Sequence, residues 1–147
     1  MTATELFPGL PDPEARPEFY DGVPMKRGLA WLIDAAVIGV LTALAVLLSA
    51  FIAAFFLPLT VLVISFLYRW VTITGRSATL GMRVMSVEFR TRYGERFDSG
   101  TALLHTLGYT VSVAVFPAQL VSIALMLITE RGQGLTDHFL GTTAVNR

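Results

Sequence analysis

An uncharged run of 34 residues, 35–68, constrains this chain more than any other feature. Extended back to residue 29, the run is interrupted only by Asp34. An α-helix needs about 20 residues to cross a bilayer. The run is therefore long enough for two crossings, and we predict helices near 28–50 and 55–74, with a short turn close to Pro58.

Composition supports a membrane protein. Of the 147 residues, 54% are apolar and 15% are charged, whereas charged residues make up about a quarter of a soluble globular chain. The 11 basic and 11 acidic residues cancel, so the balance gives no reason to expect a nucleic-acid partner. The absence of cysteine excludes disulfides and thiolate metal sites. The expected partner is the lipid bilayer.

A third uncharged run predicts a membrane segment at 101–129. As one straight helix it would be about 43 Å long, which exceeds the hydrocarbon core. Either the part near 100–114 lies along the interface before a single crossing, or Pro117 folds the run into a re-entrant hairpin. We favour the single crossing. The predicted fold class is an all-α membrane protein with three transmembrane segments, the third straight or broken at Pro117.

Basic residues predict the orientation, because short loops rich in arginine and lysine stay in the cytoplasm. Lys26 and Arg27 precede the first helix, and five arginines lie in the loop 75–98. We therefore expect a multi-pass protein of the cell inner membrane with a cytoplasmic N-terminus. This loop also contains a strand-like alternation at 83–90, and the only similar segment is 141–147. Pairing of the two would favour the hairpin.

The first 24 residues differ from the rest of the chain. They hold five of the seven prolines and carry a net charge of −4, so a stable helix is not expected there. We predict a disordered, extended and solvated acidic tail at 1–24, followed by a transmembrane domain at 25–147.

Asp34 is the most informative polar residue. A carboxylate inside a membrane helix costs at least about 2.5 kcal/mol unless it is paired, protonated or hydrated. Arg27 lies seven residues earlier, on nearly the same helical face and about 10 Å away along the axis. The two could form a charged pair at the mouth of a polar pathway. Alternatively, Arg27 reaches the headgroups and Asp34 meets Arg69 or a backbone amide.

Other features carry weaker hypotheses. Small residues recur every four positions at Ala35, Gly39 and Ala43, which favours close packing of a neighbouring helix. Arg76 and Arg83 could contact anionic lipid headgroups, or they could belong to a solvated turn. His105 could carry a proton, because histidine titrates near neutral pH, or it could be an interfacial residue without a role.

Three segments together resemble the RDD family of small bacterial membrane proteins, named for one arginine and two aspartates. These are KRGLAWLID (26–34), GRSATLGMRVMSVEF (75–89) and ERGQGLTDHFLGTTAV (130–145). The resemblance spans about 23–147. It assigns the arginine to Arg27 and the aspartates to Asp34 and Asp137.

Two positions depart from the family pattern, since many members have lysine where this chain has Met82 and arginine near His105. The resemblance implies an integral membrane protein for which transport has been suggested. If Arg27, Asp34 and Asp137 act as one site, Asp137 must reach the cytoplasmic half of the membrane, which only the hairpin allows.

Two functions remain open. The first is a transport or ion-coupling component that uses Arg27, Asp34 and Asp137, and it requires a homo-oligomer or a membrane partner protein because three helices enclose little space. The second is a non-catalytic module that docks lipids or partner proteins. No catalytic constellation, metal-ligand spacing or cofactor motif is present in the sequence, so we expect no enzyme.

Overall fold

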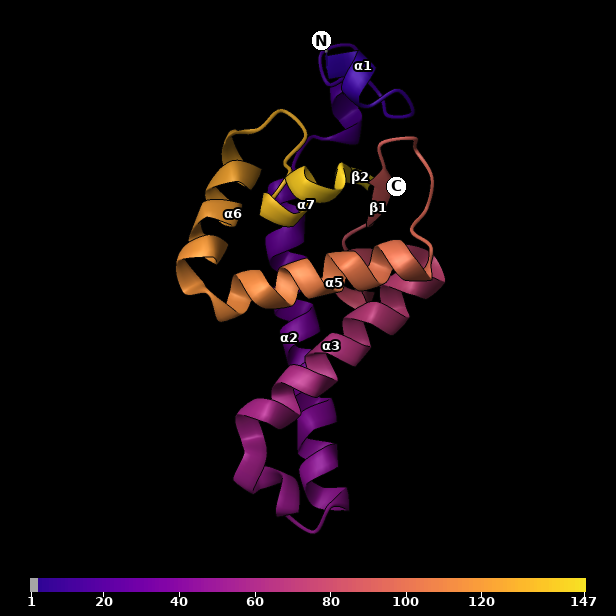
Figure 1. The fold of residues 1–147 in the computed structure, drawn as a ribbon. Helices are drawn as coiled ribbons and strands as arrows, with labels where there is room; N and C mark the ends of the chain where they lie inside the picture. Colours follow the sequence, from indigo (N-terminus) through magenta and orange to yellow (C-terminus); the bar gives the residue numbers. More distant parts are fainter. Residues whose placement is uncertain (1–2) are drawn as a thin grey trace.

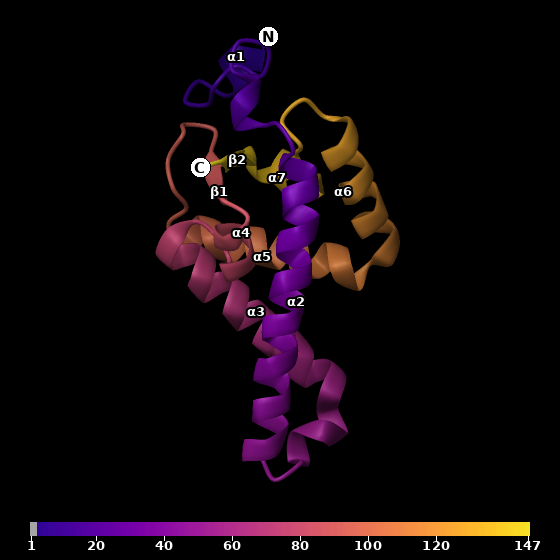
Figure 2. The same cartoon turned by 180° about the vertical axis from the view of Figure 1, so that it is seen from behind.

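The computed structural model describes residues 3–147, and Figures 1 and 2 show it from opposite sides. Two long helices extend together away from the rest of the molecule. The remaining elements pack around the N-terminal half of the first long helix. The elements in chain order are α1 (Ala3–Leu6), η1 (Pro17–Phe19), α2 (Val23–Leu48), η2 (Ile52–Phe56), α3 (Leu57–Arg76), α4 (Leu80–Val84), β1 (Val87–Thr91), α5 (Ser99–Ala114), α6 (Phe116–Ile128), α7 (Leu135–Leu140) and β2 (Thr142–Asn146).

Helices α2 and α3 are both long and apolar enough to cross a membrane, which confirms that the uncharged run forms two helices of membrane-spanning length. Helix α2 starts five residues earlier than residue 28, because Pro24 lies in its first turn, where a missing N–H costs no hydrogen bond. The turn between the helices is longer than predicted, since η2 occupies 52–56 before α3 begins at Leu57, with Pro58 in its first turn.

The third segment is bent. The chain bends by 116° between α5 and α6, and the break lies at Val115, whose backbone is not helical. Pro117, in the first turn of α6, causes the break because proline disfavours helical geometry in the residues before it. The predicted segment 101–129 is therefore two helices, with the break near Pro117 that the sequence left open.

The two predicted strand-like segments pair. Strand β1 lies antiparallel to β2, with Phe89 opposite Ala144. The strand begins at Val87 rather than at residue 83, because Arg83 and Val84 end the short helix α4. The pairing favours the hairpin over the single crossing that we preferred, because a single crossing would carry the C-terminus to the membrane face opposite β1. The C-terminus instead lies beside β1, at the N-terminal end of α2 (Figures 1 and 2).

The N-terminal segment packs on this end of the molecule, which differs from the predicted solvated tail. Leu10 and Tyr20 are buried, and the Arg131 guanidinium lies 4.7 Å from the centroid of the Phe7 ring. The Gly9 N–H donates to the Arg92 carbonyl at 2.9 Å. Apolar and aromatic side chains between the prolines supply contacts that composition alone does not indicate.

The small-residue stripe does not pack within the chain. Ala35, Gly39 and Ala43 are exposed, and a Cβ added at Gly39 would have no neighbour within 4 Å. The buried face of α2 is instead the neighbouring row 30, 34, 38 and 42. The stripe is left free on the outer surface.

Gly81 sets the distance between α2 and α4. A Cβ at this position would collide with the Ala30 carbonyl oxygen and lie 2.9 Å from the Asp34 carboxylate. At Gly75, in the last turn of α3, a Cβ would have nothing within 4 Å. The two glycines therefore provide a test position, Gly81, and a control position, Gly75, for the close packing of α2 on α4.

We expect Gly81→Ala to destabilise the fold by about 1–3 kcal/mol, the usual cost of overpacking. Gly75→Ala should be neutral or stabilising by up to about 1 kcal/mol, because alanine is the better helix former. Thermal unfolding of both purified variants in detergent measures this. Equal stability of the two variants would contradict the close packing of α2 on α4.

Candidate functional site

Asp34 is buried on α2 and is surrounded by hydrogen-bond donors. Its Oδ1 accepts from the Tyr68 hydroxyl at 2.6 Å and from the Gly81 N–H at 2.9 Å. Its Oδ2 accepts from the Thr79 hydroxyl at 2.6 Å. Arg69 adds a looser ion pair, with Nη1 3.9 Å from Oδ2. Asp34 therefore ties α2 to both α3 and α4.

The start of α4 explains two of these donors. Thr79 is the N-cap, and its Oγ1 accepts from the Met82 N–H at 3.2 Å, as threonine commonly does at a helix start. The first N–H groups of a helix have no partner inside it. The Gly81 N–H is one of these, and Asp34 accepts from it.

Asp137, on α7, is the second buried carboxylate. Arg27 Nη1 donates to its Oδ2 at 2.7 Å, and the Gly134 N–H donates to the same oxygen at 3.1 Å. Oδ1 lies 3.0 Å from His105 Nε2 and accepts from the Thr142 hydroxyl at 2.8 Å. Asp137 therefore joins α2, α5 and the start of β2.

Charge explains how Asp137 stays ionised. Burial alone would raise the pKa of Asp137, because it disfavours the charged form. The Arg27 guanidinium and the hydrogen bond from His105 act in the opposite direction and hold this pKa well below its usual range. Asp137 is therefore a carboxylate at neutral pH.

His105 belongs to this site. Its side chain is buried, and its ring centroid lies 4.4 Å from that of Phe89 and 5.5 Å from that of Phe97. The sequence left open whether His105 carries a proton or has no role. The structure places it at Asp137, a contact that only the fold of α5 against α7 creates.

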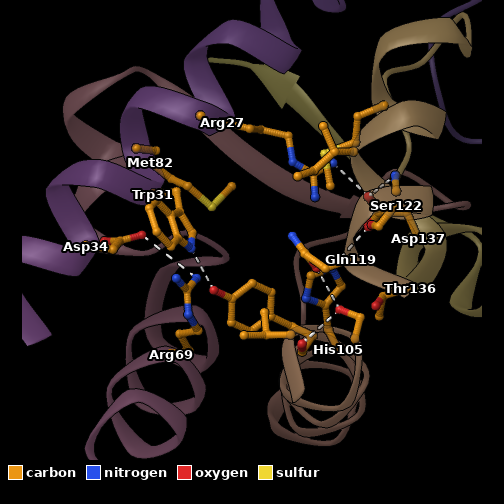
Figure 3. Close-up of a pocket in the computed structure, with 18 of the residues that line it drawn as sticks. Arg27, Trp31, Asp34, Arg69, Met82, His105, Gln119, Ser122, Thr136 and Asp137 are labelled. Atoms are coloured by element: carbon orange, nitrogen blue, oxygen red, sulfur yellow. Dashed lines mark hydrogen bonds and ion pairs between the residues drawn. The ribbon is translucent and has the colours of Figure 1, made fainter. Parts of the chain in front are cut away.

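A cavity of about 460 Å³ lies between these two carboxylates, and Figure 3 shows the side chains around it. Arg27, Asp137 and His105 approach it from one side, and Asp34 and Arg69 from the other. Within residues 3–147, no group of three histidine, aspartate or glutamate side chains is placed to hold a metal ion.

The three residues of the predicted site therefore lie in two separate clusters. Arg27 contacts Asp137, whereas Asp34 pairs with Arg69 and accepts from a backbone amide. The latter contacts are those of the alternative interpretation of Asp34. Sequence reasoning did not find Tyr68 or Thr79, although Thr79 directly before a short helix has the character of an N-cap.

The two arginines predicted to meet lipid headgroups lie in different settings. Arg76 is exposed at the end of α3. Arg83 is half-buried, and its Nη2 donates to the Thr72 carbonyl at 3.3 Å. Arg76 is therefore free to face solvent or headgroups, while Arg83 is held by α3.

Comparison with known proteins agrees with the motifs. The family model described as "RDD family" matches residues 22–141. The chain belongs to the RDD family. The match contains Arg27, Asp34 and Asp137, and it ends at Gly141, directly before β2. Searches of curated proteins and of solved structures found no match.

The Arg27–Asp137 pair should make a large contribution to stability. Removing one partner of a buried ion pair costs about 3–5 kcal/mol, and we expect Arg27→Gln to destabilise the fold by this amount in detergent. Lys26→Gln is the control, because Lys26 donates to Asn146 and not to a carboxylate. It should cost about 1 kcal/mol or less.

The stability gap between the native chain and Arg27→Gln should also depend on pH. Because the folded-state pKa of Asp137 is lowered, its contribution is complete above the unfolded value of about 3.9 and is lost as the pH falls below it. The gap should be constant from about pH 5 to 8 and narrow below about pH 4. A gap that widens on acidification would contradict the assigned pair.

Proposed function

We propose that this RDD-family chain is a non-enzymatic transport or ion-coupling component of the cell inner membrane, and that the cavity is its binding site. The observation that carries the proposal is the position of the cavity, which lies beside a broken apolar helix and between two buried arginine–aspartate pairs.

The broken helix supports this proposal. Non-helical backbone at membrane depth is tolerated where it lines a cavity or is buried in protein, and transporters commonly form their binding sites from discontinuous helices. The break at Val115 is followed by Phe116 and Gln119, which both line the cavity. The Ser112 hydroxyl donates to Gln119 Oε1 at 3.0 Å and so bridges the two helices.

The two ion pairs differ in a way that suits this role. Arg27 is bound to Asp137 through a short hydrogen bond of 2.7 Å. Arg69 lies 3.9 Å from Asp34, beyond hydrogen-bond distance, so it can change partner without breaking a hydrogen bond to that carboxylate. In this proposal Arg27 and Asp137 hold the site together, and Arg69 responds to what enters it.

The location and the assembly are also part of the proposal. The basic residues of loop 75–98 favour a cytoplasmic position for this end of the molecule, together with the N-terminus. The exposed stripe Ala35, Gly39 and Ala43 is suited to close approach of a second copy or of a partner helix. Such an assembly would enclose the space that one chain leaves open.

The alternative function, a module that docks lipids or partner proteins, is favoured by a separate observation. Each oxygen of both carboxylates accepts a hydrogen bond from another element of the fold, as expected of residues that hold helices together. In that case Asp34→Asn would lower protein abundance, and cross-linking in native membranes would recover a defined partner.

Flux through reconstituted vesicles tests the transport proposal. We expect Ile123→Trp, which fills the cavity from α6, to reduce proton flux reported by a trapped pH-sensitive dye to the level of protein-free vesicles. Val121→Trp is the matched control, because Val121 is similarly exposed on the same helix and does not line the cavity. Its flux should be unchanged.

Asp34→Asn provides a second test, since it removes the buried negative charge while keeping the side-chain shape. It should abolish flux in protein that remains folded. No flux from the native chain, or equal flux from Ile123→Trp and Val121→Trp, would refute transport through this cavity.

A further inference from the structure

Arg69 is a buried cation whose donors are not used. Its side chain is only 11% exposed, and its Nε has no hydrogen-bond partner. Within residues 3–147 its two described interactions are the 3.9 Å ion pair with Asp34 and a stacking contact, with the guanidinium carbon 4.1 Å from the centroid of the Tyr109 ring. Neither one accepts a hydrogen bond from Arg69 within ordinary distance.

Arg27 shows what a satisfied arginine looks like in the same cavity. It is buried to almost the same degree, with 12% of its side chain exposed. Its Nη1 donates to Asp137 at 2.7 Å and to the Gly132 carbonyl at 3.1 Å. A guanidinium presents five N–H donors, and buried donors normally have acceptors. Arg69 therefore lacks an acceptor that its position requires.

Asp34 is already occupied by other donors. Its two oxygens accept short hydrogen bonds from Tyr68, Thr79 and Gly81, and these donors hold the carboxylate on α2. Arg69 lines the cavity, and Figure 3 shows its guanidinium directed into the space between Asp34 and the helix that carries His105. The cavity is therefore the open route by which an acceptor can reach Arg69.

The rest of the cavity is suited to an apolar body. Its lining on α6 includes Phe116, Ile123 and Leu127, which are 67%, 45% and 70% exposed on the outer surface of the chain. On α2, Trp31 also lines the cavity and is 47% exposed. The mouth is therefore apolar and opens on a face that would contact lipid tails.

We propose that the cavity binds an amphiphile with one anionic headgroup, a carboxylate or a phosphate, that enters from the lipid phase. The headgroup accepts hydrogen bonds from the planar fork of Arg69, and the apolar body lies along α6. This proposal rests on the proposed function only in taking the cavity as a binding site. The binding experiment measures whether the cavity is occupied, and the flux assay measures transport. A failure of this proposal can therefore be told apart from a failure of the proposed function.

Trp31 provides the measurement, because it lies in the cavity wall. In a Trp70→Phe background it is the only tryptophan, since the chain has two. The protein is placed in nanodiscs of a neutral phospholipid and titrated with 9,10-dibromostearate, whose bromines quench nearby indoles. The methyl ester of the same acid is the control for quenching by lipid that is merely close.

We expect the acid to quench Trp31 at a concentration about tenfold or more below that of the ester, because hydrogen bonds to a charged group are the strong ones. Arg69→Gln should raise the concentration needed by the acid to that of the ester. Arg76→Gln, which removes an exposed arginine from the same helix, should leave it unchanged.

Equal quenching by acid and ester in the native chain would overturn the proposal without any variant, so it stays testable if Arg69→Gln does not fold. The proposal would also be overturned if Arg69→Gln needs no more of the acid than Arg76→Gln does. Inorganic phosphate is added as a competitor. Displacement of dibromostearate by millimolar phosphate would assign Arg69 to a free anion and overturn entry from the lipid phase, whereas failure to displace it supports that entry.

Discussion

A carboxylate cannot be buried without donors that compensate its lost hydration, and this constraint organises the whole chain. Asp34 satisfies it with groups from α3 and α4, and Asp137 satisfies it with Arg27, His105 and the start of β2. Both clusters include a residue of α2. Helix α2 therefore contributes a residue to each cluster, and the elements that supply the other donors pack around it.

The same constraint links the fold to the proposed function. The two clusters hold the walls of the cavity apart at fixed positions, while the bend between α5 and α6 keeps its apolar side open. Arg27 is hydrogen-bonded to Asp137 within this framework. Arg69 is also buried at the cavity, but its Nε has no hydrogen-bond partner. Walls held by satisfied carboxylates around a buried arginine with unused donors are the arrangement expected of a binding site.

Much of the fold was predictable because its signals are local or compositional. The long uncharged run predicted α2 and α3, and the strand-like segments at 83–90 and 141–147 predicted the β1–β2 pair. Whether the bend at Pro117 belongs to a single crossing or to a re-entrant hairpin was left open by the sequence, and the β1–β2 pair favours the hairpin, which was the less favoured alternative. For the site, the family resemblance pointed to Arg27, Asp34 and Asp137, and the sequence left open whether Asp34 pairs with Arg27 or with Arg69. Contacts such as that between Thr79 and Asp34 depend on how α2 and α3 cross, which no local pattern encodes.

The central claim is that the C-terminal segment returns to the side of the basic loop, where Asp137 can reach Arg27. The chain has no cysteine, so single cysteines at Arg76, Arg147 and Phe55 can be labelled in intact cells and in inverted vesicles with a reagent that does not cross membranes. All three side chains are exposed. The account predicts that positions 76 and 147 react from the same side and position 55, in the turn between α2 and α3, from the other. Labelling of 76 and 147 from opposite sides would contradict it.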